Sequence, residues 1–234
     1  KLLSKVCSHI IIHSQLDQKI VEETYAINIS KKVSIIPHGN YDGCYDLNEC
    51  RAAVFREEWH IKNDNIVLLF FGAVRPYKGV ERLIENFSLV KNSRLRLIIA
   101  GNPLNQDFAI TIAEKAKCDP RIILLLEFIP DYDVAALLSV ADVITLPFEK
   151  TLTSGSVILA LTQGKALLLP EEARVFGLVN EDCCMFFDSD ISLQNNILKL
   201  DKNKLVYMGK ESRKIANQLD WADIAKKTIK AYGL

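Results

Sequence analysis

Strand-length apolar segments alternate with helix-length amphipathic segments along most of this chain, and this alternation limits the folds it can adopt. In the segments 65–71 and 95–100 nearly every residue is apolar, which is typical of strands buried on both faces of a sheet. A segment with helical spacing of apolar side chains follows each of them. Such alternation predicts right-handed βαβ units and a parallel sheet with helices on both faces. We therefore expect a doubly wound α/β domain.

Periodicity and turn residues divide the chain into expected elements. Strands are expected at 7–14, 32–36, 65–71, 95–100, 121–125, 143–146, 165–169 and 184–187. Helices are expected at 15–25, 49–59, 80–91, 106–117, 131–139, 155–163, 192–200, 202–218 and 221–232. The segment 37–46, PHGNYDGCYD, is rich in Gly, Asn and Asp and is the best candidate for a domain boundary. In the first helix we expect Leu16, Ile20 and Tyr25 to face inward.

Composition excludes several classes of protein. Hydrophobic residues make up 49% of the 234 residues and charged residues 25%, so the chain can build a sizeable core. Lys plus Arg and Asp plus Glu both number 29, so no basic surplus indicates a nucleic-acid partner. No apolar run approaches the roughly 20 residues of a membrane span. Two His and a Ser interrupt the apolar residues of 1–14, which we interpret as a buried strand rather than a signal peptide.

The six cysteines show no C-x-x-C pair and no His at metal-ligand spacing. We therefore expect no metal site and a reducing compartment. Cys7 and Cys118 lie among apolar residues, which favours buried free thiols. Of the adjacent pair Cys183 and Cys184, we expect one side chain to be buried and one exposed, as in a strand.

The segment 142–168 contains the strongest candidate for a binding site. Here a strand ends, a polar loop follows, and a helix opens on Thr153, Ser154, Gly155 and Ser156. The first N–H groups of a helix have no partner within it, and they lie at the positive end of its dipole. Small residues leave room for a phosphate to reach them, so we expect an anion site. The alternative is that Thr153 and Ser154 only cap the helix.

In doubly wound sheets, ligands bind beyond the carboxyl ends of the strands. The loop after the strand 65–71 carries Gly72, Arg75 and Lys78. Two cations beside a helix start, next to glycines that permit close backbone approach, suit a diphosphate. The alternative is that both are solvated residues, although cations oppose the dipole at a helix N-terminus and a bound anion would compensate them.

The next two loops give weaker signals. Gly101 and Asn102 end the strand 95–100, where a plain turn and a ligand contact are both reasonable interpretations. Glu127, Phe128 and Ile129 follow the strand 121–125 and could offer backbone groups to a nucleoside base or simply pack.

His38 and Gly39 lie in the boundary segment, where a cleft between domains would open. A lone His is nevertheless more often structural than catalytic, and the sequence identifies no catalytic residue. It contains neither G-x-G-x-x-G after a strand nor G-x-x-x-x-G-K-[ST], the fingerprints of dinucleotide and P-loop sites. The T-S-G-S segment also differs from the G-x-S-x-G of esterases.

Several motifs in order resemble one known family. They are F-G-A-V-R-P-Y-K-G at 71–79, A-G-N at 100–102, F-I-P-D at 128–131, A-D-V-I-T-L-P-F at 141–148, T-S-G-S at 153–156 and A-L-T-Q-G-K at 160–165. This series is similar to the carboxyl-terminal, donor-binding domain of GT-B glycosyltransferases of the family four type. The resemblance covers nearly the whole chain. It implies Rossmann-like domains, a nucleotide-sugar substrate and no separate cofactor.

The resemblance also assigns residues. The family's diphosphate is held by an Arg and a Lys after the first strand of the domain, and Lys78 matches that Lys. The Arg usually precedes the Lys by five positions, where this chain has Ala73, whereas Arg75 precedes it by three. The family's Glu-x7-Glu pair falls on Thr151 and Leu159, and Glu149 is out of register. Direct contacts from residues 153–156 to the donor are expected instead.

The resemblance further divides the chain. Residues 1–36 resemble the end of an amino-terminal domain, 37–219 the donor domain, and 220–234 a helix that crosses back, with Trp221 buried at the junction. The remainder of the amino-terminal domain would hold the acceptor site, so we expect nucleotide binding but no sugar transfer by this chain alone. A glycan or lipid-linked acceptor and a cytoplasmic location, which includes the inner face of the membrane, follow from the same resemblance. The alternatives are an inactive nucleotide-binding partner subunit and a GT-B epimerase that acts on a UDP-sugar.

Overall fold

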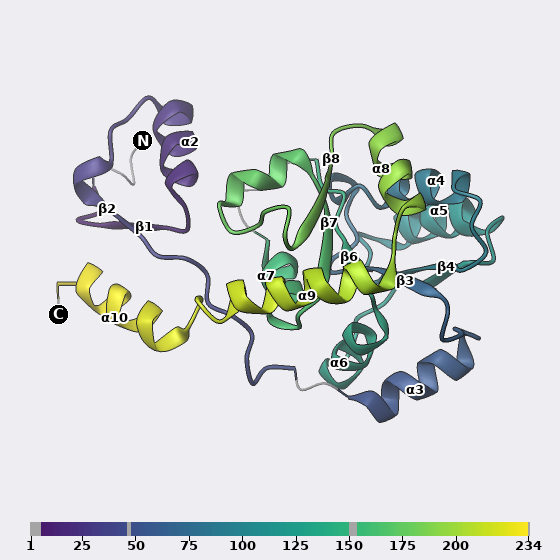
Figure 1. Ribbon diagram of the computed structural model, residues 1–234. Helices are drawn as coiled ribbons and strands as arrows, with labels where there is room; N and C mark the ends of the chain where they lie inside the picture. Colours follow the sequence, from purple (N-terminus) through teal and green to yellow (C-terminus); the bar gives the residue numbers. More distant parts are fainter. Residues whose placement is uncertain (1–5, 46–47, 150–153, 234) are drawn as a thin grey trace.

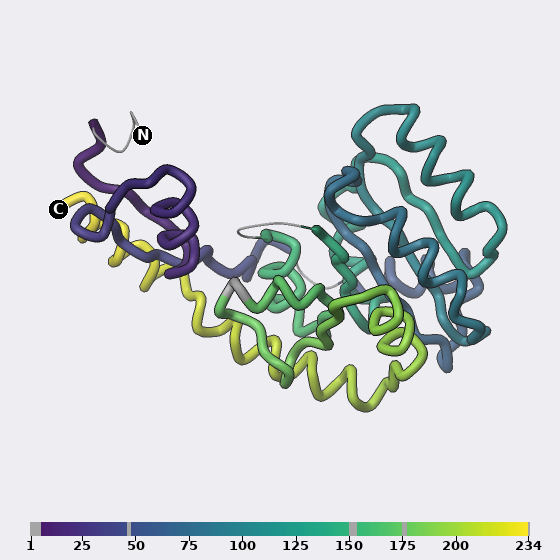
Figure 2. Tube along the Cα trace, turned by 90° about the horizontal axis from the view of Figure 1, so that it is seen from above, coloured from purple at the N-terminus to yellow at the C-terminus, as the bar shows by residue number. Residues whose placement is uncertain are grey.

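The computed structural model describes residues 6–45, 48–149 and 154–233, apart from the side chains of residues 175 and 176. A large α/β lobe contains most of the chain, and a smaller unit at the amino end lies beside it (Figure 1). The segment that follows the smaller unit runs to the large lobe, and the last helix returns to the smaller unit in both views (Figures 1 and 2).

The large lobe is built on a six-stranded sheet in which all neighbouring strands are parallel. Its strands are β3 (Ile66–Phe71), β4 (Leu95–Ala100), β5 (Ile122–Leu125), β6 (Val143–Thr145), β7 (Ala166–Pro170) and β8 (Cys184–Phe187). Side chains from Val67 to Phe70 expose 1% of their surface or less, because β3 is central and covered on both faces. The sequence prediction of a doubly wound, Rossmann-like sheet is confirmed.

Two layers of helices cover the sheet (Figure 1). One layer contains α4 (Val80–Leu89), which packs against both α5 (Gln106–Ala116) and α8 (Asp190–Leu198). In the other layer α3 (Glu49–Glu58) packs against α6 (Asp131–Val140), and α7 (Gly155–Thr162) packs against α9 (Lys202–Ala216). Short 3₁₀ turns form at η1 (Ser30–Lys32), η2 (Pro76–Lys78) and η3 (Glu171–Phe176).

The strand order places the reversal of the winding next to β3. The order is β5-β4-β3-β6-β7-β8, so the chain first winds outward from β3 through β4 to β5 and then returns to add β6 on the other side. Neighbouring loops at such a reversal leave in opposite directions, and the crevice between them is where sheets of this kind bind ligands. The loops after β3 and β6 flank that crevice.

The smaller unit consists of β1 (Ile10–Ile12), α2 (Gln15–Tyr25) and β2 (Val33–Ile35), with the two strands parallel. The last helix, α10 (Trp221–Ala231), lies beside this unit in both views (Figures 1 and 2). β1 is shorter than the expected 7–14, because Ser14 already caps α2 by accepting a hydrogen bond from the N–H of Asp17.

The junction between the lobes is held by Asn40 and Trp221. The Asn40 N–H donates to the carbonyl of Leu219 at 2.9 Å, and its side-chain amide donates to the carbonyl of Ala216 at 3.1 Å. The indole N–H of Trp221 donates back to the Asn40 carbonyl at 2.7 Å. Gly39 lies under the indole so closely that a Cβ there would lie 2.3 Å from the ring. Trp221 therefore packs against Gly39 at the junction and remains 53% exposed in this chain.

Some burial predictions were wrong, for local reasons. Tyr25 is 51% exposed at the last position of α2, and the buried residue of that helix is Asp17 in its first turn. Cys118 is exposed because it lies in the turn after α5 rather than in the sheet. Cys183 and Cys184 are both buried: Cys183 precedes β8, and its thiol lies 3.4 Å from the Asn180 carbonyl. Because the two residues lie where β8 begins, they do not follow the alternation of buried and exposed side chains that is expected inside a strand.

Candidate functional site

The loops after β3 and β4 touch at the carboxyl edge of the sheet. Gly101 has a φ of 146°, and a Cβ at this position would lie 1.9 Å from the carbonyl oxygen of Gly72. The N–H of Val74 donates to the Asn102 carbonyl at 3.0 Å, which extends the contact beyond the strands. Only glycine permits this approach, so Gly72, Gly101 and Asn102 have a structural role that the sequence interpretation had left open.

Arg75 braces the same two loops. One guanidinium nitrogen donates to the carbonyls of Val74 and Asn102, both at 2.9 Å. The side chain forms no ion pair with any carboxylate among the described residues. Part of its hydrogen-bonding capacity is thus used within the loops, while its positive charge stays near the carboxyl edge of the sheet.

Lys78 is a half-buried cation that has no counter-ion among the described residues. It closes η2, and burial lowers the pKa of its ammonium group below the ordinary value. Within the described parts of the chain the ammonium group makes no hydrogen bond or ion pair, and the ring centre of Tyr77 lies 5.5 Å from Nζ. An ammonium group that is partly removed from water without an anion is unfavourable, and a bound anion would compensate it.

Gly79 joins the loop after β3 to the loop after β6. It adopts a left-handed conformation with φ 71°, and a Cβ here would lie only 2.2 Å from the carbonyl oxygen of Pro147. The N–H of Glu149 also donates to the Tyr77 carbonyl at 3.0 Å. The two loops that flank the reversal of the sheet therefore support each other directly.

The start of α7 faces these loops. Ser154 is buried and caps the helix, its hydroxyl accepting a hydrogen bond from the N–H of Val157 at 3.4 Å. The N–H groups of Gly155 and Ser156 have no acceptor among the described residues. A Cβ at Gly72 would lie 3.0 Å from the Ser156 hydroxyl, so the first turn lies against the loop after β3. Capping and anion binding are thus compatible here, while Thr153 lies outside the described residues.

Tyr41 is a site residue that sequence reasoning missed. Its hydroxyl lies 2.9 Å from where a Cβ of Gly155 would be, and its N–H donates to the Thr162 hydroxyl at 3.1 Å. Burial raises the pKa of the phenol, so it remains a hydrogen-bond donor at neutral pH. The only available signal was an aromatic residue within a segment of Gly, Asn and Asp.

A comparison with known protein families identifies the family of this chain. The family of glycosyl transferases group 1 matches residues 52–169, which contain β3 to β6, all of β7 but its last residue, and the loops just described. The chain belongs to this family.

Two relatives of known name match the chain over different shares of their length. The GDP-mannose:glycolipid 4-beta-D-mannosyltransferase of Xanthomonas campestris pv. campestris is 35% identical over 103 residues, which are 44% of this chain and 30% of that protein. The lipopolysaccharide 1,2-N-acetylglucosaminetransferase of Salmonella typhimurium is 24% identical over 238 residues, 93% of this chain and 60% of that protein. The chain thus spans about one third to three fifths of the length of these relatives.

Solved structures support the GT-B fold. Anabaena HepE, solved in complex with UDP and glucose, has a TM-score of 0.83 at 19% identity over 99% of this chain and 65% of its own. The sucrose-phosphate synthase of Thermosynechococcus elongatus has a TM-score of 0.81 at 18% identity over 99% of this chain and 59% of its own. Both likenesses concern the fold alone.

The remaining predicted residues of this group 1 family member lie at two other places, the loop after β5 and the junction between the lobes. Phe128 is 75% exposed and Glu127 is also exposed, whereas Ile129 packs into the core. They follow β5, at the edge of the sheet. His38 belongs to the junction between the lobes, where its ring centre lies 5.4 Å from that of Tyr41 and 6.2 Å from that of Trp221.

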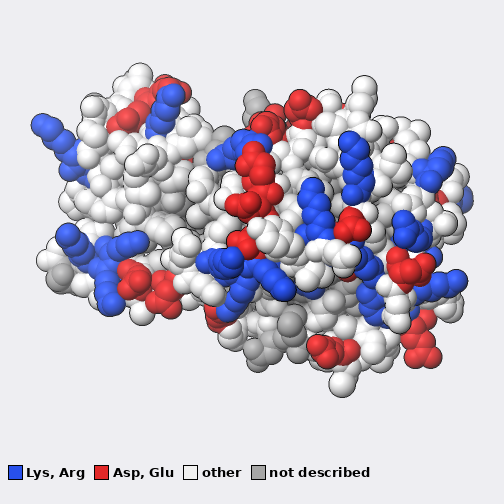
Figure 3. Space-filling model, viewed as in Figure 1, with Lys and Arg blue, Asp and Glu red and all other residues white. Residues whose placement is uncertain are grey.

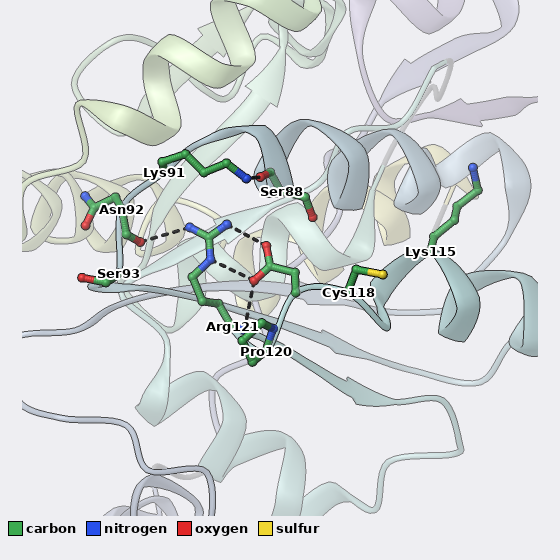
Figure 4. Close-up of a pocket in the computed structure, with 9 residues that line it drawn as sticks. Ser88, Lys91, Asn92, Ser93, Lys115, Cys118, Pro120 and Arg121 are labelled. Carbon is green, nitrogen blue, oxygen red and sulfur yellow. Dashed lines mark hydrogen bonds and ion pairs between the residues drawn. The ribbon is translucent and has the colours of Figure 1, made fainter.

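One pocket lies away from these loops. It has a volume of about 650 Å³ and opens near the start of β5, at the amino edge of the sheet (Figure 4). Arg121 lies along one side of it (Figure 4). Its guanidinium donates to Asp119, to the carbonyl of Phe87 in the last turn of α4, and to the carbonyls of Val90 and Asn92 just after that helix. Those bonds close the end of the helix, so the guanidinium is already used by the fold.

Neither a single-sign charged patch on the face drawn in Figure 3 nor a cluster of metal ligands among the described residues marks a further site. On the face shown in Figure 3, positive and negative side chains are interspersed, in line with the net charge of zero. No group of three His, Cys, Asp or Glu that could hold a metal ion occurs among the described residues. In the same residues no helix is long and apolar enough to cross a membrane.

Proposed function

We propose that this chain binds the diphosphate of a nucleotide-sugar at the carboxyl edge of its sheet and holds this donor while the sugar is transferred to a glycan or lipid-linked acceptor. Lys78 would neutralise the diphosphate, and the N–H groups of Gly155 and Ser156 would donate to its oxygens. Arg75 adds positive charge from the same loop, and the Tyr41 hydroxyl provides a fourth donor from the linker. In sugar transfer the leaving nucleotide gains negative charge, which fixed cations and a helix dipole stabilise.

The observation that carries this proposal is that Lys78 has no counter-ion among the described residues and lies in the loop whose Gly72 faces Ser156 in the first turn of α7. Two unit charges 4 Å apart interact by about 4 kcal/mol at an effective dielectric constant of 20. That energy is available to a bound anion, since no described carboxylate pairs with Lys78. The loop that carries Lys78 and the loop that leads to α7 also flank the point at which the winding of the sheet reverses. This point is the expected place for a nucleotide.

A guanine nucleotide is the first candidate donor. The 35% identical relative carries GDP-mannose in its name and acts on a glycolipid, and the Salmonella relative acts on lipopolysaccharide. We therefore place this chain in the assembly of a glycolipid or a related surface glycan. The proposal includes a cytoplasmic location at the membrane face, where lipid-linked acceptors would be met.

A second candidate is a nucleotide-binding partner subunit without transfer activity. The buried Leu159 of α7 favours it, because the family resemblance places a carboxylate at this position. A chain without that carboxylate could bind the diphosphate and still lack a contact to the donor sugar.

Calorimetric titration with GDP, UDP and ADP tests the binding step. We expect one nucleotide to bind, and Lys78→Ala to weaken its affinity by about 1.5–3 kcal/mol, or roughly ten- to 150-fold. Lys210→Ala is the matched control, because Lys210 is an exposed residue of α9 far from the site in sequence and makes no described side-chain contact. Equal affinity in the wild type and in Lys78→Ala would refute the assignment.

Transfer of radiolabelled mannose from GDP-mannose to extracted glycolipid then separates the two candidates. Product formation by the full protein supports the transferase. Tight nucleotide binding without product, under conditions in which a known mannosyltransferase turns over, supports the partner subunit.

A further inference from the structure

A second pocket opens at the amino edge of the sheet, on the side away from the proposed donor site. Its volume is about 350 Å³, within the range of about 300–1,000 Å³ found for small-molecule sites. It is lined by Glu49, Ala52, Ala53, Arg56, Ser139 and Lys165. Four of these residues come from α3, Ser139 comes from the last turn of α6, and Lys165 precedes β7. Ser139 and Lys165 lie just ahead of β6 and β7, which places the pocket at the amino edge.

Arg56 is the first unusual group in this pocket. It lies in the last turn of α3, and one of its terminal guanidinium nitrogens, Nη1, is buried without a hydrogen-bond partner among the described residues. An unsatisfied donor on a charged group is costly, and native structures rarely leave one without water or an ion.

Lys165 is the second cation. Its ammonium donates to the Ala141 carbonyl at 2.9 Å, which uses one of its three N–H groups. Burial lowers its pKa, and the neighbouring positive charge of Arg56 lowers it further. The two cations therefore share a confined space and have donor capacity to spare.

The acidic groups near the pocket form no described ion pair with Arg56 or Lys165. Asp142 supplies a negative charge that counteracts the lowering of the Lys165 pKa, and its Oδ2 accepts a hydrogen bond from the N–H of Val67 at 2.7 Å; the two residues form no described ion pair. Glu49 is exposed and forms no described ion pair with Arg56 or Lys165. The Ser139 hydroxyl donates to the Ala135 carbonyl, which leaves Arg56 and Lys165 as the donors available among the lining side chains.

We propose that this pocket binds a small phosphate-class oxyanion, either orthophosphate or a phosphomonoester, between Arg56 and Lys165. The forked guanidinium matches two phosphate oxygens and the ammonium reaches a third, so the ligand satisfies the buried Nη1. The carboxyl edge with Lys78 and α7 is at the opposite end of the strands, so the two sites do not compete. The Glu49 carboxylate opposes the anion from the pocket wall.

The test is thermal unfolding at constant ionic strength with increasing orthophosphate and, in a second arm, methyl phosphate. We expect a saturable rise in Tm with wild type, and an affinity at least about tenfold weaker in Arg56→Gln and in Lys165→Gln. A stronger response to methyl phosphate identifies a phosphomonoester as the ligand, and a stronger response to orthophosphate identifies the free ion. Arg94→Gln, at an exposed position with no described side-chain contact, is the control and should respond like wild type.

Two more variants distinguish phosphate binding at this pocket from phosphate binding at the donor site and from an ion pair within the pocket. Lys78→Ala should keep the full phosphate response, since a lost response would place the anion at the donor site and overturn the proposal. Glu49→Gln should tighten phosphate binding, because it removes the opposing charge. Should Glu49→Gln instead lower Tm without phosphate and leave the affinity unchanged, Glu49 is the counter-ion of Arg56 and the proposal fails. It also fails when Arg56→Gln binds phosphate as tightly as wild type.

Discussion

Replacing Gly79 by Ala should disrupt the contact between the loops after β3 and β6, which flank the proposed donor site. The substitution introduces a side chain at φ 71°, where the left-handed conformation costs a residue with a Cβ about 1–2 kcal/mol. The new Cβ would also lie 2.2 Å from the Pro147 carbonyl oxygen, and relieving an overpacked contact costs about 1–3 kcal/mol more. The sum is about 2–5 kcal/mol of unfolding free energy, or a fall in Tm of about 4–20 °C for a chain of this size.

Gly177→Ala is the matched control. Gly177 has a φ of 62°, but no described atom lies within 4 Å of the Cβ that the substitution would add. It should therefore lose only the conformational part, about 1–2 kcal/mol. The gain from a less flexible unfolded chain applies to both variants and cancels in their difference.

Urea unfolding followed by circular dichroism measures both losses, and calorimetry measures nucleotide binding in the same samples. We expect Gly79→Ala to be the less stable variant and to bind nucleotide more weakly, because the loop that carries Lys78 must shift away from Pro147. Equal losses of stability in the two variants would refute the contact on which this reasoning depends.

Three further predictions concern titratable groups. Diphosphate binding should weaken as pH rises through the lowered pKa of Lys78, because the anion favours its charged form; calorimetry between pH 7 and pH 10 should show this slope, and Lys78→Ala should remove it. Tyr41→Phe should weaken nucleotide binding by about 0.5–1.5 kcal/mol, which is the contribution of one neutral hydrogen bond. Tyr45→Phe is the control and should leave the nucleotide affinity unchanged. Equal losses of affinity in the two variants would contradict the role of Tyr41. Burial raises the pKa of Cys183 and raises that of Cys184 well above its usual value, so a thiol reagent should label both only after unfolding, and fast labelling of either in the native protein would contradict their burial.

The sheet was predictable because its signals are local. The apolar residues of 66–71 and 95–100 identify buried parallel strands without reference to the rest of the chain, and the glycines and cations that follow mark the ligand edge. Lys78 and the start of α7 were found in this way. The family model and the structural neighbours agree with the predicted family and fold, while the roles of Lys78 and α7 stay predictions.

Contacts between distant segments were not predictable from spacing. Nothing in the sequence near Tyr41 indicates that its hydroxyl reaches Gly155, because the approach depends on how the linker lies along α7. Arg75 shows the same limit. Its type and position indicate a phosphate ligand, yet two of its hydrogen bonds go to loop carbonyls that only the fold brings within reach.

The hydrogen bonds of Asn40 also restrict how the two lobes can move. The chain passes between the lobes twice, once on leaving the smaller unit and once before α10, and Asn40 bonds to Ala216, Leu219 and Trp221 on the returning segment. Because hydrogen bonds of Asn40 join the two crossing segments, we expect these segments to move together as one hinge. We therefore expect opening and closing of the lobes to be a rotation about that point.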